Sequence, residues 1–260
     1  MNPSFIINLG PIDIDTIREL TNCETRGISE GENFTDLLSL NNLKNNKKTI
    51  TFVYENYRKK IDINKDTVLI ISKKDLPKHN CFKRLIIVDN VHSSLAKLSS
   101  LFYRDINEND TFLRDIEVGN DCSISKNAIL HKGCKIGSNS IIKDGAVIGF
   151  NCVIGKNSFI EENSIISHSI IGDSVKIGRN TSIGQKGFGF SMEKNCNIDI
   201  FHSGRVILQS NVSIGSNCCV DRGSFGDTII GENTYFDNLC HIAHNVHIGR
   251  NCVFAAMTGI

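Results

Sequence analysis

Residues 134–155 read CKIGSNSIIKDGAVIGFNCVIG, and isoleucine or another aliphatic residue returns there at every sixth position. The same spacing begins near Val118 and continues, with interruptions, to Ile260. One bulky aliphatic residue in six cannot line a sheet sandwich, where apolar residues alternate with a period of two. It can line the inside of a stacked coil whose flat sides are short strands. The stretch therefore predicts a parallel β-helix over residues 113–260.

Each hexad carries two further regular positions. Glycine is common one residue after the aliphatic position, as at Gly137, and small residues such as Ser140 stand four residues after it. We expect the small residue to point inward and the glycine to occupy a turn with positive φ. Six of the ten cysteines fall on the small-residue position, and none forms a C-x-x-C pair. They are expected to be reduced packing residues rather than disulfide or zinc ligands.

Residues 1–112 lack the repeat and predict a small α/β domain. Residues 13–20 read as a short helix with Asp13 as its N-cap, and residues 92–103 as an amphipathic helix. Three runs rich in β-branched and apolar residues predict strands, at residues 48–54, 67–71 and 84–88. The polar stretch 103–110 is expected to be a linker to the β-helix.

Composition excludes several classes of protein. The 29 basic and 28 acidic residues leave a net charge of +1, so nothing favours nucleic acid or an anionic membrane as a partner. No run of 18 apolar residues exists, which argues against a transmembrane span. The first twenty residues lack a basic segment followed by an apolar one, so we expect a mature, cytoplasmic protein.

One cluster in the ladder has the residue types of a reactive site. His241, His244 and His247 stand at hexad positions, and neutral imidazole accepts protons near pH 7. A histidine on the turn of a solvated coil is more often an ordinary surface residue, although the uninterrupted repeat around His244 would hold a base rigidly. A second feature is the excursion Gly184–Val206, which leaves the ladder, as loops that form binding faces do.

These segments together resemble the UDP-3-O-acylglucosamine N-acyltransferases of lipid A biosynthesis. The resemblance rests on four segments of the β-helical part: Ile183–Phe190 (IGQKGFGF), Gly204–Val206, Val220–Gly223 with Asp227 and Thr228, and Asp237–Val246 (DNLCHIAHNV). It extends to the first domain through Ile50–Phe52 with Tyr57 and Arg58, Lys74–Pro77, and Leu85–Val88.

The resemblance implies a left-handed β-helix and a homotrimer. It also implies transfer of a 3-hydroxyacyl group from acyl carrier protein, through its phosphopantetheine arm, to the 2-amine of UDP-3-O-acyl-glucosamine. No metal and no other cofactor are implied. His244 matches the family's general base, and the spacing of Asp227, about one coil earlier, suggests that it orients His244. The residues expected to bind substrate are Phe52 and Tyr57, which would sandwich uracil, with Gln185, Lys186, Phe188, Phe190, Asp237, Asn238 and His241.

Three alternatives stay open. The spacing from Phe52 to Tyr57 is one residue shorter than the family's aromatic pattern, which allows another sugar-nucleotide N- or O-acyltransferase of the same fold. The three histidines allow a zinc enzyme, although they alternate between hexad positions that point in different directions. Members of the family continue with further coils and helices beyond the position of Ile260, so we expect the β-helix to be incomplete at this end. A truncated inactive form or an assembly module is therefore also considered.

Overall fold

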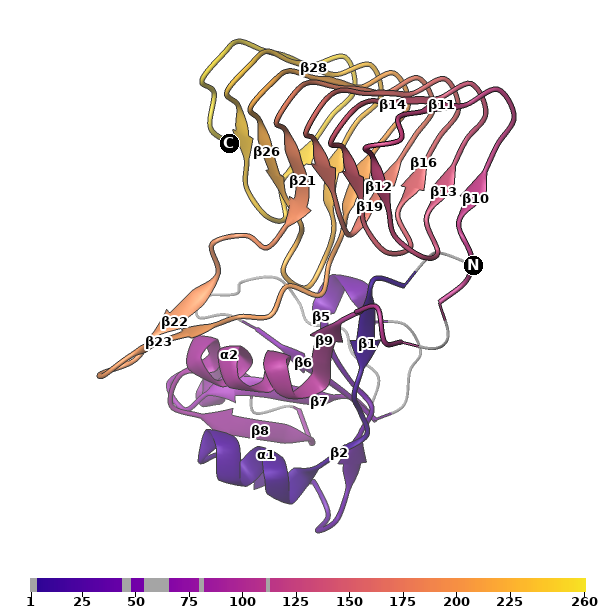
Figure 1. Ribbon diagram of the computed structural model, residues 1–260. Helices are drawn as coiled ribbons and strands as arrows, with labels where there is room; N and C mark the ends of the chain where they lie inside the picture. Colours follow the sequence, from indigo (N-terminus) through magenta and orange to yellow (C-terminus); the bar gives the residue numbers. More distant parts are fainter. Residues whose placement is uncertain (1–3, 44–47, 54–65, 80–81, 111–112) are drawn as a thin grey trace. The chain divides into compact units, whose positions relative to one another are not determined.

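The computed structural model describes residues 4–43, 48–53, 66–79, 82–110 and 113–260 (Figure 1). These residues form two compact units. One contains Met1–Ile6, Asp105–Phe188 and His202–Ile260, and the other contains Ile7–Arg104 and Gly189–Phe201. The predicted division into 1–112 and 113–260 differs from this one at the N-terminus, at residues 105–112 and at the excursion. No helix in the described ranges is long and apolar enough to cross a membrane.

The α/β unit is built on a five-stranded sheet in the order β3-β8-β7-β6-β5. Its strands are β3 (Glu24–Arg26), β5 (Asp36–Ser39), β6 (Thr49–Phe52), β7 (Val68–Ser72) and β8 (Leu85–Val88). Strands β5 to β8 are parallel, and β3 is antiparallel at one edge. β6, β7 and β8 are buried along their whole length, as the apolar runs at 67–71 and 84–88 predicted for β7 and β8.

Both predicted helices are present. α1 (Ile14–Thr21) begins where the Asp13 carboxylate accepts hydrogen bonds from the N–H groups of Asp15 and Thr16, so the predicted N-cap is confirmed. α2 (Val91–Phe102) has Asn90 in the same role. Short elements complete this part of the chain: β1 (Ile6–Asn8) paired with β9 (Tyr103–Asp105), β2 (Ile12–Asp13) paired with β4 (Asn33–Phe34), and the 3-10 turns Leu40–Asn42 and Leu76–His79.

The polar stretch 103–110 is not a simple linker. Tyr103 begins strand β9 and is only 4% exposed. Its hydroxyl donates to the carbonyl of Leu37 and contacts the carboxylate of Asp36. The prediction of a linker over the whole stretch was therefore wrong, because the tyrosine anchors the end of α2 against β5.

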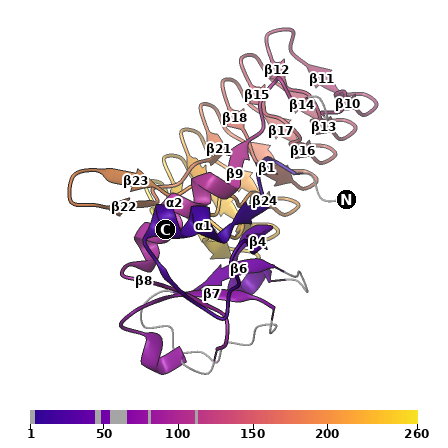
Figure 2. The ribbon, with the colours of Figure 1, turned by 90° about the horizontal axis from the view of Figure 1, so that it is seen from below.

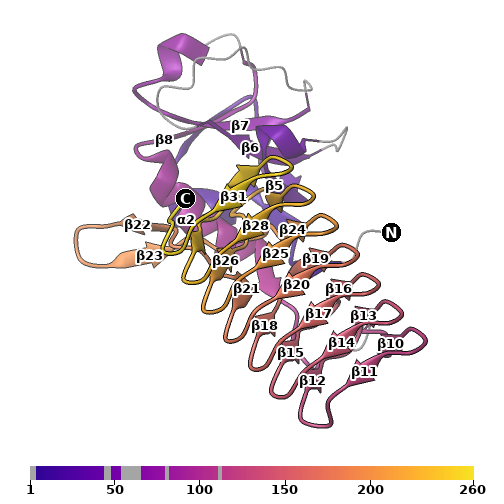
Figure 3. The same cartoon turned by 90° about the horizontal axis from the view of Figure 1, so that it is seen from above.

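The second unit is a parallel β-helix with three long sheets, one for each side of the coil (Figure 3). The first sheet contains β10 (Glu117–Val118), β13 (Lys135–Ile136), β16 (Val153–Ile154), β19 (Ser169–Ile171), β24 (Val206–Leu208), β27 (Thr228–Ile230) and β30 (His247–Ile248). The second contains β11 (Ser123–Ile124), β14 (Ile141–Ile142), β17 (Phe159–Ile160), β20 (Lys176–Ile177), β25 (Ser213–Ile214), β28 (Tyr235–Phe236) and β31 (Val253–Phe254). The third contains β12 (Ile129–Leu130), β15 (Val147–Ile148), β18 (Ile165–Ile166), β21 (Ser182–Gln185), β26 (Cys219–Asp221) and β29 (His241–Ile242).

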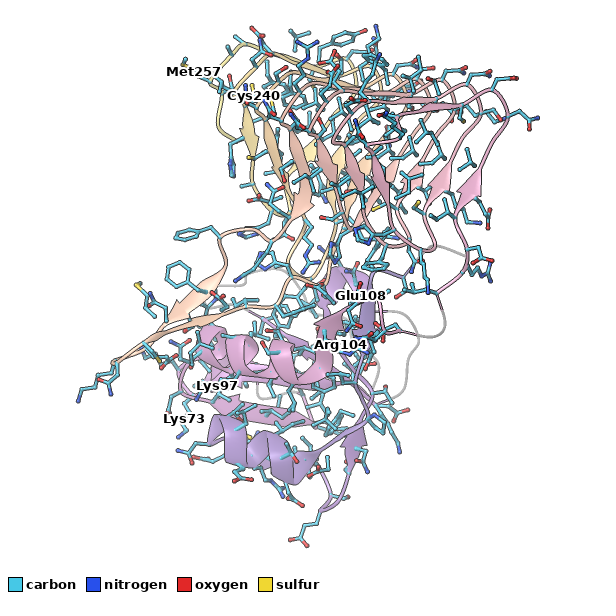
Figure 4. All side chains as sticks on the ribbon, viewed as in Figure 1. Lys73, Lys97, Arg104, Glu108, Cys240 and Met257 are labelled. Atoms are coloured by element: carbon cyan, nitrogen blue, oxygen red, sulfur yellow. The ribbon has the colours of Figure 1, made fainter. Side chains whose placement is uncertain are left out.

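Aliphatic side chains stack in register from one coil to the next. Ile136 pairs with Ile154, three hexads later, and Ile148 pairs with Ile166. All four side chains are no more than 3% exposed. The predicted parallel β-helix and its inward aliphatic column are confirmed, while the handedness implied by the family stays an expectation. Figure 4 draws the side chains on the ribbon, with Cys240 and Met257 labelled in the last coils.

The reason for the repeated glycine differs from the prediction. Gly137, Gly155 and Gly178 are not among the residues with positive φ. A Cβ atom on Gly137 would lie 2.5 Å from the carbonyl carbon of Gly155 in the next coil, so glycine is required by close packing of the coils. Positive φ occurs instead two residues later, mostly at asparagine, as at Asn139 (φ 61°). Asparagine tolerates this left-handed conformation better than most residues.

The packing role of the cysteines is confirmed in the middle of the β-helix. Cys134, Cys152, Cys218 and Cys240 are no more than 2% exposed, and no disulfide links any cysteine in the described ranges. Burial raises the pKa of the Cys152 thiol to about 12. The Cys152 thiol is therefore a protonated, apolar packing group at neutral pH.

The excursion contains a hairpin that the sequence did not predict. β22 (Phe190–Met192) and β23 (Asn197–Asp199) pair antiparallel and contact α2 (Figure 2). The ring of His92 in α2 hydrogen-bonds the carbonyl oxygen of Phe190 at 2.9 Å, and the Ser99 hydroxyl accepts from the N–H of Phe201. The hairpin therefore belongs to the α/β unit, whereas Gly184–Phe188 remain with the β-helix.

Candidate functional site

His244 occupies the turn that follows β29. Two segments that flank the hairpin in sequence meet its ring. The ring of His202 lies edge-on to it, with centroids 5.1 Å apart and an interplanar angle of 85°. A Cβ atom on Gly187 would lie 2.8 Å from Cδ2 of His244, so the backbone of Gly187 approaches the ring closely. His202 is fully buried and His244 is partly exposed. The imidazole of His244 is therefore held on two sides and remains accessible.

The two nitrogens of His244 have different surroundings. Nδ1 lies 2.8 Å from Nδ2 of Asn245. Nε2 has no hydrogen-bond partner among the residues that the structure describes. A side chain anchored through one nitrogen and open at the other is the arrangement that proton transfer to a bound substrate requires.

Asp227 is not brought into contact with His244. Both of its carboxylate oxygens accept from the guanidinium of Arg205, at 3.0 and 2.6 Å, and one also accepts from the Arg205 backbone N–H. Its backbone carbonyl lies 3.0 Å from Nε2 of His247. Asp227 therefore links neighbouring coils through Arg205 and His247. No hydrogen bond in the described part of the chain supports its predicted role of orienting His244.

Gln185 and His241 meet at a buried carboxylate that sequence reasoning did not select. Gln185 donates from Nε2 to Asp221 at 2.8 Å and accepts from the Ser182 hydroxyl at 2.7 Å. Nε2 of His241 lies 3.3 Å from the other Asp221 oxygen. The side chain of Asp221 is 6% exposed and that of His241 is 56% exposed. The two predicted substrate-binding residues thus share one anchor on the face formed by β21, β26 and β29.

The remaining predicted residues of the β-helical unit lie on exposed turns. Asp237 and Asn238 form the turn before β29, where Asp237 accepts from both nitrogens of Asn238, and Asn238 accepts from the Ser216 N–H. Lys186 is exposed, and Phe188 is 85% exposed. The roles of Lys186 and Phe188 in substrate binding stay predictions.

Three predicted residues lie elsewhere. Phe52 ends β6 at the carboxyl edge of the parallel sheet and is 5% exposed. Phe190 begins the hairpin in the same unit and is partly exposed. Tyr57 lies outside the described residues. The uracil-binding role of Phe52 and Tyr57 therefore stays a prediction.

Sequence reasoning also missed an ionic cluster in the β-helical unit. Asp105 accepts from Arg222 at 2.9 Å and lies 2.9 Å from Nε2 of His168. Burial acts to raise the pKa of Asp105, but hydrogen bonds from His168 and Arg222 outweigh it and lower the pKa to about 2. Burial lowers the pKa of His168, against the opposing hydrogen bond from Asp105. His168 and Arg222 lie 63 and 117 residues from Asp105 in the sequence, so no local sequence pattern could predict the cluster.

A metal centre finds no support in the described ranges. No group of three or more His, Cys, Asp or Glu side chains there is arranged to hold an ion. His241 and His247 are committed to different partners, Asp221 and the Asp227 carbonyl. The arrangement of the described side chains therefore does not support the zinc hypothesis.

Comparison with known proteins finds similarity to transferases in two segments of the β-helix. The family described as bacterial transferase hexapeptide (six repeats) matches residues 115–150 and 227–260, and the second segment contains His244. The chain is 53% identical over 98 residues to the UDP-3-O-acylglucosamine N-acyltransferase of Caulobacter vibrioides, which covers 38% of this chain and 29% of that protein. The enzyme of the same name from Methylobacterium nodulans is 50% identical over 95 residues, or 36% of this chain and 27% of its own length.

The resemblance inferred from sequence motifs is thus confirmed for part of the chain, and the chain covers less than a third of each of these relatives. Among solved structures, the UDP-N-acetylglucosamine acyltransferase from Bacteroides fragilis is 29% identical, with a TM-score of 0.46 over 53% of this chain and 52% of that one. The sequence matches, rather than this partial overlap, carry the comparison.

Proposed function

We propose that the protein is an N-acyltransferase that acts on a sugar nucleotide. The proposed reaction moves a 3-hydroxyacyl group from the phosphopantetheine thioester of acyl carrier protein to the 2-amine of UDP-3-O-acyl-glucosamine, a step of lipid A biosynthesis. A carbon–nitrogen bond forms, the carbon–sulfur bond breaks, and the amine proton passes to the departing thiolate.

One observation carries the proposal. In a segment matched by the hexapeptide transferase family, His244 is anchored through Nδ1 and leaves Nε2 without a partner among the described residues. A general base must be within reach of the proton it removes and must be fixed by its surroundings. In the proposed mechanism His244 accepts the amine proton as nitrogen attacks the thioester carbonyl, and then returns it to sulfur.

The other predicted site residues are proposed to bind substrate. Gln185 and His241, joined through Asp221, are proposed to bind the acceptor sugar on the face beside the catalytic turn. Lys186, Phe188, Asp237 and Asn238 are exposed and are proposed to contact donor or acceptor. Phe52, Tyr57 and Phe190 are proposed to contact the nucleotide. No metal ion or further cofactor takes part in this mechanism.

A homotrimer in the cytoplasm completes the proposal. Outward positions of the coils carry apolar side chains that a neighbouring copy would cover. Ile129 and Ile165 on the third sheet are 54% and 48% exposed, and Tyr235 and Val253 on the second are 49% and 79% exposed. Exposed apolar surface of this kind is common where subunits associate. Light scattering coupled to size-exclusion chromatography measures the assembly directly.

The activity is tested by incubating the purified chain with UDP-3-O-acyl-glucosamine and 3-hydroxyacyl-acyl carrier protein. We expect mass spectrometry to find an N-acylated product that requires both substrates. A parallel reaction supplies acetyl-coenzyme A and other amino-sugar nucleotides. Product formed only in that reaction would replace the proposed substrates with those of another sugar-nucleotide acyltransferase. A folded chain that forms no product in either reaction would overturn the proposed activity for this chain.

A further inference from the structure

In the resting protein the side chain of Asn245 is held by contacts that do not involve His244. Its Oδ1 accepts the backbone N–H of Ser224 at 2.9 Å, and its Nδ2 donates to the Ser224 hydroxyl at 2.9 Å. Its own backbone N–H donates to the hydroxyl of Thr228 at 3.0 Å, and its backbone adopts the left-handed conformation with φ of 65°. These contacts tie the catalytic turn to the turn 223–228 of the preceding coil.

The orientation of the amide follows from the Ser224 contact. A backbone N–H is always a donor, so the atom that faces it must be the amide oxygen. Rotating the amide by half a turn would set two donors against each other and lose that hydrogen bond. The NH₂ group is therefore the part of Asn245 that lies 2.8 Å from Nδ1 of His244.

This contact decides which tautomer of His244 is present. Neutral imidazole has one nitrogen that donates and one that accepts. Because the amide NH₂ can only donate, Nδ1 must accept, and the single proton lies on Nε2. The backbone of Gly187 and the ring of His202 hold the imidazole in this orientation, and His202 is the titratable side chain in ring contact with it.

We infer that Asn245 is a positioning residue that controls the proton of His244. In the resting protein its NH₂ group keeps the proton on Nε2. Before Nε2 can accept the proton of the substrate amine, Nε2 must release its own proton to solvent while Nδ1 takes one up from solvent. The resulting Nδ1–H group then needs an acceptor beside it. The amide of Asn245 supplies that acceptor when it rotates, gives up the hydrogen bond from the Ser224 N–H and presents its oxygen to Nδ1. An asparagine can serve both states, whereas aspartate serves only the second and leucine serves neither.

The inference deepens the proposed function and rests on it for the role of His244, but its first test needs no turnover. Two-bond proton–nitrogen correlation spectra of the ¹⁵N-labelled chain distinguish protonated from unprotonated ring nitrogens. The signals of His244 are identified by their loss in the His244→Gln variant. We expect Nδ1 to be unprotonated and Nε2 to be protonated in the neutral parent chain. The opposite pattern would overturn the inference, whether or not any variant folds.

A substitution series gives the second test. Asn245→Asp is expected to move the proton to Nδ1, because a carboxylate can only accept. Asn217→Asp is the matched control, since Asn217 is exposed, has a φ of 55° and occupies a similar turn. It is expected to leave the spectrum of His244 as in the parent chain. An unchanged His244 spectrum in a folded Asn245→Asp variant would contradict the assignment.

Kinetics then separate the inference from the proposed function. Asn245→Leu is expected to lower kcat by roughly tenfold to a hundredfold, the loss seen when a partner that orients a metal-bound histidine is removed. KM should be unchanged, and Asn245→Asp should restore most of kcat. Equal kcat in the parent and leucine variants, with an active parent, would overturn the inference alone. The expected spectra with an inactive parent chain would instead overturn the proposed function.

Discussion

Asn157 and Asn245 occupy turns of the same left-handed backbone, with φ of 55° and 65°, but in different parts of the β-helix. Asn157 lies among regular coils, where it and the preceding Lys156 are exposed. Asn245 is tied to Ser224, and the preceding His244 is packed against Gly187 and His202. The repeat supplies the same turn in both places. Only interruptions of the repeat bring other segments onto the second turn and make it a site.

The sharpest test of this difference removes an imidazole from each of these two parts of the β-helix. His244→Ala is expected to lower kcat by about 10²- to 10⁴-fold, the usual contribution of a general base. His131→Ala, which removes a histidine from the regular coils, is expected to leave kcat unchanged. Both are measured as product formed per active chain under saturating substrates. Comparable activity in the two variants would contradict the assignment of His244.

The regular coils are expected to carry stability rather than activity. Ile148 is fully buried in β15, and its truncation to alanine is expected to cost about 2–5 kcal/mol of the free energy of unfolding. Ile165 lies in the next strand of the same sheet but points outward and is 48% exposed, so the same truncation is expected to cost less than about 1 kcal/mol. Urea unfolding of both variants measures the difference. Equal losses would show that the inward column does not dominate the stability of the coils.

The close approach of Gly187 to the imidazole is testable with a single methyl group. In Gly187→Ala the added carbon would meet Cδ2 and Cβ of His244 at 2.8 and 2.9 Å, so the ring must move. We expect kcat to fall about tenfold or more, because small displacements of a catalytic group are costly. Gly249→Ala is the matched control in a later turn, where the nearest atom is 4.0 Å away. An unaltered rate in Gly187→Ala would show that the ring tolerates displacement.

The smallest expected effect concerns the cluster around Asp105. The folded pKa of Asp105, about 2, lies below its ordinary value of 3.8, so the group adds stability above pH 4. That stability is lost as pH falls from about 4 to 2. Because the side chain is 49% exposed, we expect the change to be about 1 kcal/mol after solvent screening.

Unfolding curves at several pH values measure this loss, with Asp105→Asn as the variant that should lack it. Asp121→Asn, at an exposed turn of the regular coils, is the control that should keep the parent's pH dependence. Identical pH dependence in the parent and Asp105→Asn chains would remove the cluster from the account of stability.

Much of the fold could be predicted because its signals are local. A hexapeptide period specifies which residue of each coil points inward, and Asp13 specifies where α1 begins. The reason for glycine at Gly137 could not be read locally, because the atom that excludes a side chain belongs to Gly155 in the next coil. Tyr103 was misread for the same reason, since its partners Asp36 and Leu37 lie more than sixty residues away.

The sequence by itself determined the repeating coil and its inward-facing aliphatic column, and it selected His244 as the candidate general base. It could do so because the hexapeptide period and the motif around His244 are local patterns of neighbouring residues. The tertiary structure alone decided what surrounds that histidine. Asp227, close to it in coil spacing, is held by Arg205, whereas Gly187 and His202 reach the ring from either side of the hairpin. A repeat determines the direction of each side chain from its position in the coil. The contacts made by an interruption depend on where the chain returns, and only the folded backbone shows that.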